Sequence, residues 1–267
     1  MPISLYDTNI GGRFKKLLVS ALPPRFLLFV KKVYYVRAVP SFWEADFQPL
    51  RSLVLPDEIV VDIGANVGWY TNLLSRLVGG SGKVFSIEPI PETFNLLNAV
   101  IRGLGLRNVE SINCGISETD TTALMEIPLW ENGTPNLYFA RVVPSQLTSL
   151  SPMQYTVSMR SMDSLFADGL SQKVTFIKCD VEGHELSVIK GARQFLERCK
   201  PAWLIEVSGN PDEPNSPARE LFRCLEDHQY SAYWFNGQRL VKRTTPDQST
   251  NYFFLQPTHR SRLAGLI

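Results

Sequence analysis

The chain has 267 residues, of which 44% are hydrophobic and 20% charged, and its formal net charge is +1. This length suits one large α/β domain with a substantial core and is short for two compact domains. A net charge this close to zero provides no global field that attracts nucleic acid, so no nucleic-acid partner is expected.

The cysteines and the early apolar run indicate a cytoplasmic protein. Cys114, Cys179, Cys199 and Cys224 are widely spaced without a C-x-x-C pair, a pattern that predicts neither a zinc site nor a disulfide framework. The most apolar early run, Phe26 to Val30, has five residues, far short of the roughly 20 that span a bilayer. We expect no signal peptide and no membrane span.

Residues 1–46 are predicted to form a basic helical segment in front of a domain that covers residues 47–267. The first 43 residues hold seven basic side chains and one acid, interleaved with apolar residues as in a basic amphipathic helix. Residues 13–37 could therefore rest on the anionic inner face of a membrane. The alternative is a solvated helix that covers one end of the sheet, and Pro23-Pro24 divides the segment into two short helices.

The stretch 59–71, which follows a short predicted helix over 47–55, indicates a strand, a tight turn and a helix start. Ile59-Val60-Val61 is a β-branched run that suits a buried strand, and it leads to Asp62. Gly64 lets the turn come close to a ligand, and Gly68 lets the helix that runs to Val78 pack near the strand.

The same turn argues against a dinucleotide. A G-x-G-x-x-G fingerprint counted from Gly64 needs glycine at positions 66 and 69, where the chain has Asn66 and Trp69. The D-x-G-x-x-x-G spacing instead suits a ligand with a cationic amino acid part and no phosphate.

Lys83 to Ile87 is predicted as the next strand and ends at Glu88, 20 residues after Gly68. A doubly wound sheet presents an acid to ribose hydroxyls at this place. A ribose without a 2′-phosphate, joined to an aminoacyl sulfonium, describes S-adenosylmethionine. After a helix over 93–104 and a strand over 109–113, the Gly115-Ile116 turn is placed along the adenine ring, with a plain structural turn as the alternative.

Residues 119–160 are less regular and are predicted to be an insertion or lid that recognises the acceptor. Paired strands over 123–127 and 155–159 flank a loop with Trp130, Tyr138 and Phe139. Beyond it, strands are expected over 174–179 and 202–205, helices over 184–198 and 218–228, and two last strands over 231–235 and 252–255, joined through the Asn236-Gly237 turn.

Four of the predicted strands end on carboxylates, namely Asp62, Glu88, Asp180 and Glu206. Ligands of a parallel sheet with helices on both faces bind outside the carboxyl ends of the strands. We therefore expect these acids to surround one site.

Motifs at these strand ends resemble a known family. Lys178 to Glu185 reads K-C-D-V-E-G-H-E. With the neighbouring segments 161–165 and 201–206, it is similar in order and spacing to the K-x-D-x-E-G-x-E block of the FkbM-type family of class I S-adenosylmethionine-dependent methyltransferases. D-I-G-A-N-V-G-W-Y-T followed by S-I-E-P carries the same resemblance, which covers about residues 50–207.

The resemblance implies a Rossmann-like, doubly wound α/β fold with a mostly parallel seven-stranded sheet in the order 3-2-1-4-5-7-6. It also implies methyl transfer from S-adenosylmethionine to a hydroxyl of a sugar, glycan, glycolipid or related natural product. The residues that would hold the aminoacyl part of the cofactor are Asp62, Gly64, Asn66 and Gly68. Glu88 would hold the ribose and Gly115-Ile116 the adenine, while Asp180, Glu182 and His184 would face the methyl group and the acceptor.

A hydroxyl acceptor gains from a base that takes its proton. His184 is one candidate, with an unperturbed pKa of about 6.5, and Glu182 is its rival. The alternatives for these two residues are a surface position at a helix start and a helix cap. Asp180, Glu182 and Glu206 are candidate Mg²⁺ ligands, an alternative that is not favoured because Glu206 lacks an adjacent amide.

Two other functions remain as alternatives to methyl transfer. One is an NAD-dependent oxidoreductase, which Asn66 and Trp69 disfavour because they replace the glycines of its fingerprint. The other is a non-catalytic scaffold that uses the basic N-terminal segment on a membrane surface.

Overall fold

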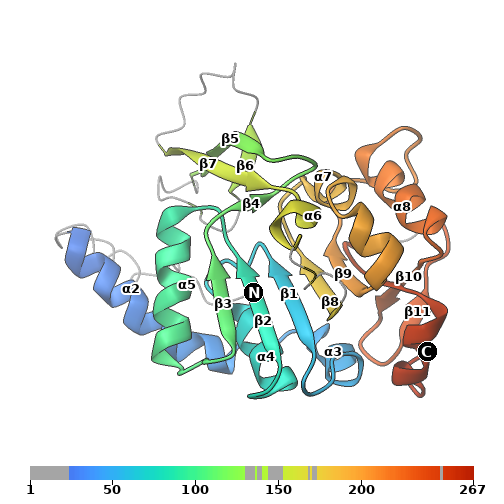
Figure 1. Ribbon diagram of the computed structural model, residues 1–267, viewed down its shortest axis with the longest axis horizontal. Helices are drawn as coiled ribbons and strands as arrows, with labels where there is room; N and C mark the ends of the chain where they lie inside the picture. The colour runs from blue at the N-terminus through green and yellow to red at the C-terminus, as the bar shows by residue number, and fades with distance from the viewer. Residues whose placement is uncertain are drawn as a thin grey trace, which may run out of the picture.

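The computed structural model describes residues 24–129, 136, 140–143, 153–167, 169, 173–246 and 249–267. This part of the chain contains an eight-stranded sheet with helices on both faces and a four-stranded sheet near the carboxyl ends of its strands (Figure 1). The chain therefore has the expected α/β architecture.

The large sheet has the strand order β11-β10-β12-β9-β8-β1-β2-β3. Its strands are β1 (Ile59–Ile63), β2 (Lys83–Ile87), β3 (Val109–Ile112), β8 (Val174–Cys179), β9 (Ala202–Glu206), β10 (Ser231–Phe235), β11 (Leu240–Lys242) and β12 (Asn251–Leu255). The first five of these are parallel, β12 is antiparallel to both β9 and β10, and β11 is antiparallel to β10.

Seven of these strands have the expected order 3-2-1-4-5-7-6, when β8, β9, β10 and β12 are counted as strands 4 to 7. The expected count of seven is wrong by one strand, because β11 extends the edge of the sheet. The Asn236-Gly237 turn leads from β10 into β11, and not directly into the strand near residue 252.

The large sheet has a hydrophobic core on each face. Successive side chains of a strand point to opposite faces, so Val60 and Val84 join one core while Val61 and Phe85 join the other. α3 (Phe47–Leu53) and α4 (Trp69–Val78) cover the first face, and α7 (Glu185–Lys190) and α8 (Pro217–Asp227) cover the second. The predicted buried strands are confirmed.

Two helices begin at residues that favour a helix start. Pro91 and Pro217 lie in the first turns of α5 (Pro91–Gly103) and α8, where a missing N–H costs nothing. Ser216 caps α8 by accepting a hydrogen bond from Arg219 N at 3.0 Å. The remaining helical elements are α2 (Pro24–Ala38), η1 (Val39–Ser41), α6 (Met162–Leu165), η4 (Phe195–Cys199) and η5 (Pro257–Leu263).

The single helix expected over 184–198 is wrong. α7 ends at Lys190, and the separate π-helical turn η4 begins at Phe195. Gly191 lies between them, and a Cβ at this position would overlap the main-chain oxygen of Ser117. The helix therefore ends where the chain passes directly against the segment that follows β4 (Gly115–Ile116).

The small sheet has the strand order β4-β7-β5-β6, with β5 (Thr121–Glu126), β6 (Arg141–Val143) and β7 (Gln154–Arg160). The expected pairing of the strands near 123 and 155 is confirmed, because β5 and β7 are antiparallel neighbours. A small core that includes Met125, Val157 and Met159 lies beneath them. Trp130, Tyr138 and Phe139 lie outside the described residues.

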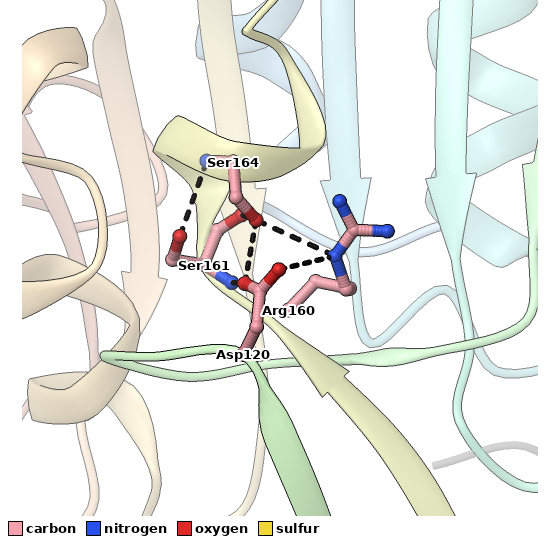
Figure 2. A network of polar contacts seen from close by, with 4 residues as sticks. All are labelled: Asp120, Arg160, Ser161 and Ser164. Carbon is pink, nitrogen blue, oxygen red and sulfur yellow. Dashed lines mark hydrogen bonds and ion pairs between the residues drawn. The ribbon is translucent and has the colours of Figure 1, made fainter.

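Asp120 ties the small sheet to the rest of the molecule (Figure 2). Its carboxylate accepts hydrogen bonds from Ser161 N at 2.8 Å and Ser164 Oγ at 2.5 Å, and it pairs with Arg160 Nε at 2.9 Å. Ser161 also caps α6, since its side chain accepts from Ser164 N at 3.1 Å. The start of β5, the end of β7 and α6 are thereby held together.

α2 lies alongside α5 at the β3 edge of the molecule (Figure 1). Leu28, Tyr35 and Val36 of α2 pack against a cluster that includes Leu96 and Val100 of α5. The first half of the predicted basic segment, residues 1–23, is outside the described residues. Among the helices that the structure describes, none has the length and apolarity needed to cross a bilayer.

Candidate active site

A cavity of about 250 Å³ lies at the carboxyl ends of β1, β2 and β8, beside the small sheet. The structure brings together in its wall all of the site residues predicted from the sequence except Gly68 and Glu206. These are Asp62, Gly64, Asn66, Glu88, Gly115, Ile116, Asp180, Glu182 and His184. Two segments far apart in the chain, 62–66 and 180–184, thus face one space.

The two glycines of the first turn have different surroundings. Gly64 has φ +76°, and a Cβ there would overlap the main-chain oxygen of Asp180, so the turn after β1 touches the turn after β8. Gly68 has φ +98°, and its Cβ would lie 3.0 Å from Leu97 of α5. Gly68 therefore allows α4 to pack closely on α5, and not on the strand β1 as expected. It does not line the described cavity wall.

Asp62 is fixed beneath the turn. It is 2% exposed, and its Oδ2 accepts a hydrogen bond of 2.6 Å from the Thr71 hydroxyl, which lies 2.9 Å from Ser86 Oγ. Burial raises the pKa of Asp62 to about 6, against the opposing effect of the Thr71 hydrogen bond. The positive charge of Lys178 also opposes this rise, while the negative charge of Asp180 adds to it.

Glu88 is held by main-chain amides at the end of β2. Its Oε2 accepts from Asn66 N at 3.0 Å and its Oε1 accepts from Ile90 N at 2.9 Å. Burial nevertheless raises the pKa of Glu88 to about 7. Each carboxylate oxygen can accept more than one hydrogen bond, so the oriented group can still receive hydroxyls of a ligand.

Two polar atoms of the wall have no partner. Asn66 Oδ1 and the Tyr70 hydroxyl are buried without a hydrogen-bond partner among the described residues. An unsatisfied buried polar group costs about 1–3 kcal/mol. Asn66 also has φ +49°, in the left-handed region. A ligand with hydrogen-bonding groups near Asp62 would satisfy both atoms.

Lys178 forms a charged centre below the cavity. It is 2% exposed, its Nζ lies 3.4 Å from Asp180 Oδ2, and it is 4.9 Å from the centre of the Tyr70 ring. Burial alone would lower the pKa of Lys178, but the negative charges of Asp180 and Glu206 outweigh it, and the net shift is upward. Lys178 therefore stays protonated at neutral pH.

Glu206, the fourth strand-end acid, is not in the described wall and lies behind Asp180. Its side chain is hydrogen-bonded to Asp180, and burial, followed by the charge of Asp180, raises the pKa of Glu206 to about 7. Glu206 and Asp180 thus interact directly, and Lys178 is the positive charge beside them.

Glu182 and His184 form the opposite part of the wall. Glu182 has φ +51°, and burial, followed by the charge of Asp180, raises its pKa to about 7. The Nε2 of His184 lies 3.0 Å from the Ser117 hydroxyl, and burial lowers the pKa of His184. At neutral pH the imidazole is therefore uncharged.

Several residues of the site were not predicted from the sequence. Phe42 and Glu44 line the cavity although they belong to the segment assigned to the N-terminal helices, and burial raises the pKa of Glu44 to about 7. No motif marks these two positions. Tyr70 belongs to the glycine-turn motif itself, and Ser117 directly follows Gly115-Ile116, so proximity to a motif could have indicated them.

The wall is rich in acids. Of the described lining residues, only Lys178 carries a fixed positive charge, against the carboxylates of Glu44, Asp62, Glu88, Asp180 and Glu182. In the described part of the chain, no group of three or more His, Cys, Asp or Glu residues is arranged to hold a metal ion. The Mg²⁺ alternative at Asp180, Glu182 and Glu206 stays a prediction. The excess of acids suits a cationic organic ligand.

Comparisons with known proteins agree with this geometry. A profile of the Methyltransferase FkbM domain matches residues 62–232. Hexuronic acid methyltransferase AglP of Haloferax volcanii is 30% identical over 143 residues, which are 53% of this chain and 52% of that protein. Methyltransferase 1 of Beauveria bassiana is 27% identical over 179 residues, which are 61% and 64% of the two chains. The match thus spans about half to two thirds of these relatives.

Solved structures are more distant. Methyltransferase FkbM from Methylobacillus flagellatus has a TM-score of 0.49 and 23% identity, over 75% of this chain and 44% of that one. Aeropyrum pernix fibrillarin, solved with S-adenosyl-L-methionine bound, has a TM-score of 0.45 and 15% identity, over 75% and 66%.

The domain profile covers well over half of the chain and includes the motifs that carry the resemblance, from Asp62 to Glu206. The resemblance is therefore confirmed: this chain belongs to the FkbM family of methyltransferases.

Proposed function

We propose that this protein is an S-adenosylmethionine-dependent O-methyltransferase whose acceptor is a hydroxyl of a sugar, glycan, glycolipid or related natural product. The observation that carries the proposal is the single acid-lined cavity in which Asp62, Glu88 and Asp180 meet around the glycine turn. Family membership supports methyl transfer. The name of the Haloferax volcanii relative, a hexuronic acid methyltransferase, supports a sugar acceptor.

The residues present fit the cofactor. Glu88, oriented by the Asn66 and Ile90 amides, accepts the ribose hydroxyls. The unpaired Asn66 Oδ1 and Tyr70 hydroxyl, next to the buried Asp62, hydrogen-bond the ammonium and carboxylate of the aminoacyl part. Gly115 and Ile116, with the apolar side chains of the small sheet, form the wall for the adenine.

When bound, the cofactor supplies an electrophilic methyl group whose carbon–sulfur bond breaks, with its electron pair on sulfur, as the acceptor oxygen bonds the carbon. The acidic wall favours a ligand with a positive sulfur, because the buried carboxylates have few cations of their own. Holding the acceptor oxygen and the methyl carbon at about 3 Å supplies several kcal/mol of the rate acceleration.

The acceptor proton needs a base. We assign this role to Glu182, because burial gives its carboxylate a pKa of about 7, which matches proton transfer at neutral pH. His184 is uncharged and its Nε2 lies within hydrogen-bond distance of Ser117. We assign it to positioning the acceptor. Lys178 forms an ion pair with Asp180, two residues before Glu182.

Isothermal calorimetry tests the cofactor assignment. We expect S-adenosylhomocysteine to bind and NAD not to bind, since Trp69 lies in the wall where a dinucleotide fingerprint requires glycine. Glu88→Ala should weaken S-adenosylhomocysteine at least about tenfold, the loss of one to two hydrogen bonds to a charged group. The matched control is Glu110→Ala, an exposed glutamate on the next strand that pairs with Lys83.

Three outcomes separate the alternative functions. Binding of NAD alone contradicts the methyltransferase and supports the oxidoreductase. Binding of neither ligand supports a non-catalytic scaffold. Binding of S-adenosylhomocysteine, followed by transfer of labelled methyl to saccharide acceptors and not to amines or thiols, supports the proposal.

A further inference from the structure

A second cavity, of about 410 Å³, opens beside the first. Its described wall consists of Pro128, Asn136, Arg141, Glu182, Gly183 and Ser208. Glu182 is the residue that this wall shares with the wall of the first cavity. The two cavities therefore meet at the side chain to which we assign the acceptor proton.

Glu185 fixes one side of the second cavity. This residue is 4% exposed, and its Oε1 accepts a hydrogen bond from Gly183 N at 2.7 Å and another from Ser208 Oγ at 3.3 Å. Gly183 follows β8 and Ser208 follows β9. A single buried carboxylate thus joins the two loops that form this side.

The other side is formed by Arg141 of β6 and by Pro128 and Asn136, which lie between β5 and β6 in the chain. Asn136 is 6% exposed, and its N–H donates to the Pro128 carbonyl at 2.8 Å. Arg141 donates from Nε at 3.1 Å and from Nη2 at 2.8 Å to Oε1 of Glu126, its partner across β5 and β6. Glu126 is buried, while 61% of the Arg141 side chain is exposed. The guanidinium is therefore oriented but accessible.

The two cavities differ in chemistry. The first has many apolar lining residues, among them Ile87, Ile116, Met125 and Met159, as an adenosine group requires. Apart from Pro128, the described wall of the second consists of a guanidinium, an amide, a hydroxyl, a carboxylate and a glycine. Such a wall offers several donors and acceptors to a ligand with many hydroxyls and little to an apolar or aromatic one.

The backbone at the junction is also unusual. Glu182 and Gly183 have φ +51° and φ +95°, two successive residues in the left-handed region. This conformation is unfavourable for a non-glycine residue and persists where the surrounding structure enforces it. Here Gly183 N donates a hydrogen bond to Glu185 Oε1, and this bond holds the turn. The turn places the Glu182 side chain in the walls of both cavities.

We propose that the second cavity is the acceptor subsite and that it binds a sugar ring, with Arg141, Asn136 and Ser208 hydrogen-bonding its hydroxyls and the reacting hydroxyl at Glu182. This assignment rests on the proposed function, and it adds the location and the residues of acceptor recognition. Arg141 is a specificity residue whose orientation depends on Glu126, and Glu185 is a positioning residue for Gly183 and Ser208.

Initial-rate kinetics with labelled cofactor test the subsite on a panel of methyl glycosides, including a methyl glucuronide, with phenols and simple alcohols for comparison. We expect methylation of glycosides. Arg141→Ala and Ser208→Ala should each raise the KM for the glycoside about tenfold, the effect of one lost hydrogen bond of about 1.4 kcal/mol. The dissociation constant of S-adenosylhomocysteine should change less than about twofold, because neither residue lines the first cavity.

Two further variants keep the test decisive. Arg141→Lys keeps the positive charge opposite Glu126 but loses the planar pair of donors, so it should raise the KM for the glycoside. This variant keeps the test valid if Arg141→Ala fails to fold. Arg239→Ala removes an exposed arginine near the turn between β10 and β11 and should leave KM unchanged.

The failure of this subsite is distinct from the failure of the proposed function. No binding of S-adenosylhomocysteine to the wild-type protein removes the function itself. Binding of S-adenosylhomocysteine together with methylation of phenols or simple alcohols alone, or of no acceptor in the panel, overturns the subsite. An unchanged glycoside KM in folded Arg141→Lys and Ser208→Ala proteins overturns it as well.

Discussion

Glu182 determines the pH dependence that the proposed reaction should show. A general base must be deprotonated to accept a proton, and burial raises the pKa of Glu182 to about 7. We therefore expect kcat/KM to rise with pH through about 7 and to level off above it. Glu182→Gln should lower kcat about 100-fold or more and remove this rise, with little change in the affinity for S-adenosylhomocysteine.

The competing assignment is His184, and the same pH profile distinguishes the two. His184→Gln should change kcat less than Glu182→Gln and should keep the rise near pH 7, because the pKa of His184 is lowered by burial. A His184→Gln enzyme that loses the rise, beside a Glu182→Gln enzyme that keeps it, would move the base to His184.

Gly64 is a position where the neighbouring backbone leaves no room for a side chain. The Cβ of Gly64→Ala would overlap the Asp180 carbonyl, and φ +76° is unfavourable for alanine. We expect Gly64→Ala to lower the free energy of unfolding by about 3 kcal/mol or more. Gly79→Ala is the matched control, since Gly79 has φ +67° and nothing within 4 Å of an added Cβ.

The difference between these two glycine variants isolates the contact. Gly79→Ala should cost about 1 kcal/mol from the left-handed backbone alone. Equal losses in urea unfolding for the two variants would show that the turn after β1 does not press on the turn after β8.

Sequence patterns predicted those site residues that lie at the carboxyl end of a strand. Asp62, Glu88 and Asp180 were predictable because parallel strands bring their carboxyl ends to one edge of a sheet. Glu44 was not, because it comes from a segment without periodicity that meets the cavity only through tertiary packing. Burial raises the pKa of Glu44 and the charge of Lys178 opposes this rise, and neither is visible in the chain before folding.

At the scale of elements, long and strongly patterned segments were predicted and short or interrupted ones were not. The buried strand Val174–Cys179 lies where its apolar run predicts it. β11 has only three residues, Leu240–Lys242, too few to show alternation. The end of α7 depends on the contact between Gly191 and the Ser117 carbonyl, a tertiary contact without a local signal.

α2 has an exposed face that suits an anionic membrane surface. Phe26 and Phe29 are 50% and 60% exposed, and their ring centres are 6.3 Å apart. The helix carries four basic residues and no acid. We expect the protein to sediment with phosphatidylglycerol vesicles more than with phosphatidylcholine vesicles, and less so at high salt.

The phenylalanines provide the variants for this experiment. Phe26→Ser/Phe29→Ser should reduce sedimentation with phosphatidylglycerol vesicles, whereas Leu55→Ser, at another exposed hydrophobic residue, should not. Equal sedimentation with both lipids, or none with either, would support the solvated helix that covers the β3 edge of the sheet.

For the whole molecule, the gathering of acids in one place links stability to pH. Burial raises the pKa of Asp62 to about 6 and the pKa of Glu44, Glu88, Glu182 and Glu206 to about 7. Between about pH 4.5 and 7 the folded protein therefore binds more protons than the unfolded chain, so these groups make folding less favourable as pH rises through that window.

Two half-buried histidines oppose this trend at the acidic end. Burial lowers the pKa of His184 and His259, so their contribution to stability is lost as pH falls below about 6.5. Above that pH the histidines are neutral in both states, and only the acids still titrate. The fall in stability between about pH 6.5 and 7.5 should therefore come mainly from the acids.

Thermal unfolding of the ligand-free protein measures this effect. We expect Tm to fall from pH 6.5 to 8, and Glu206→Gln to flatten the fall, because it removes one raised pKa and the repulsion with Asp180. S-adenosylmethionine, with its positive sulfur, should stabilise the protein more strongly at pH 8 than at pH 6, since the acids are then ionised and lack cations. A Tm that rises across this range would mean that the buried acids are already paired in the free protein, and the attraction of the cavity for a cationic ligand would lose its physical basis.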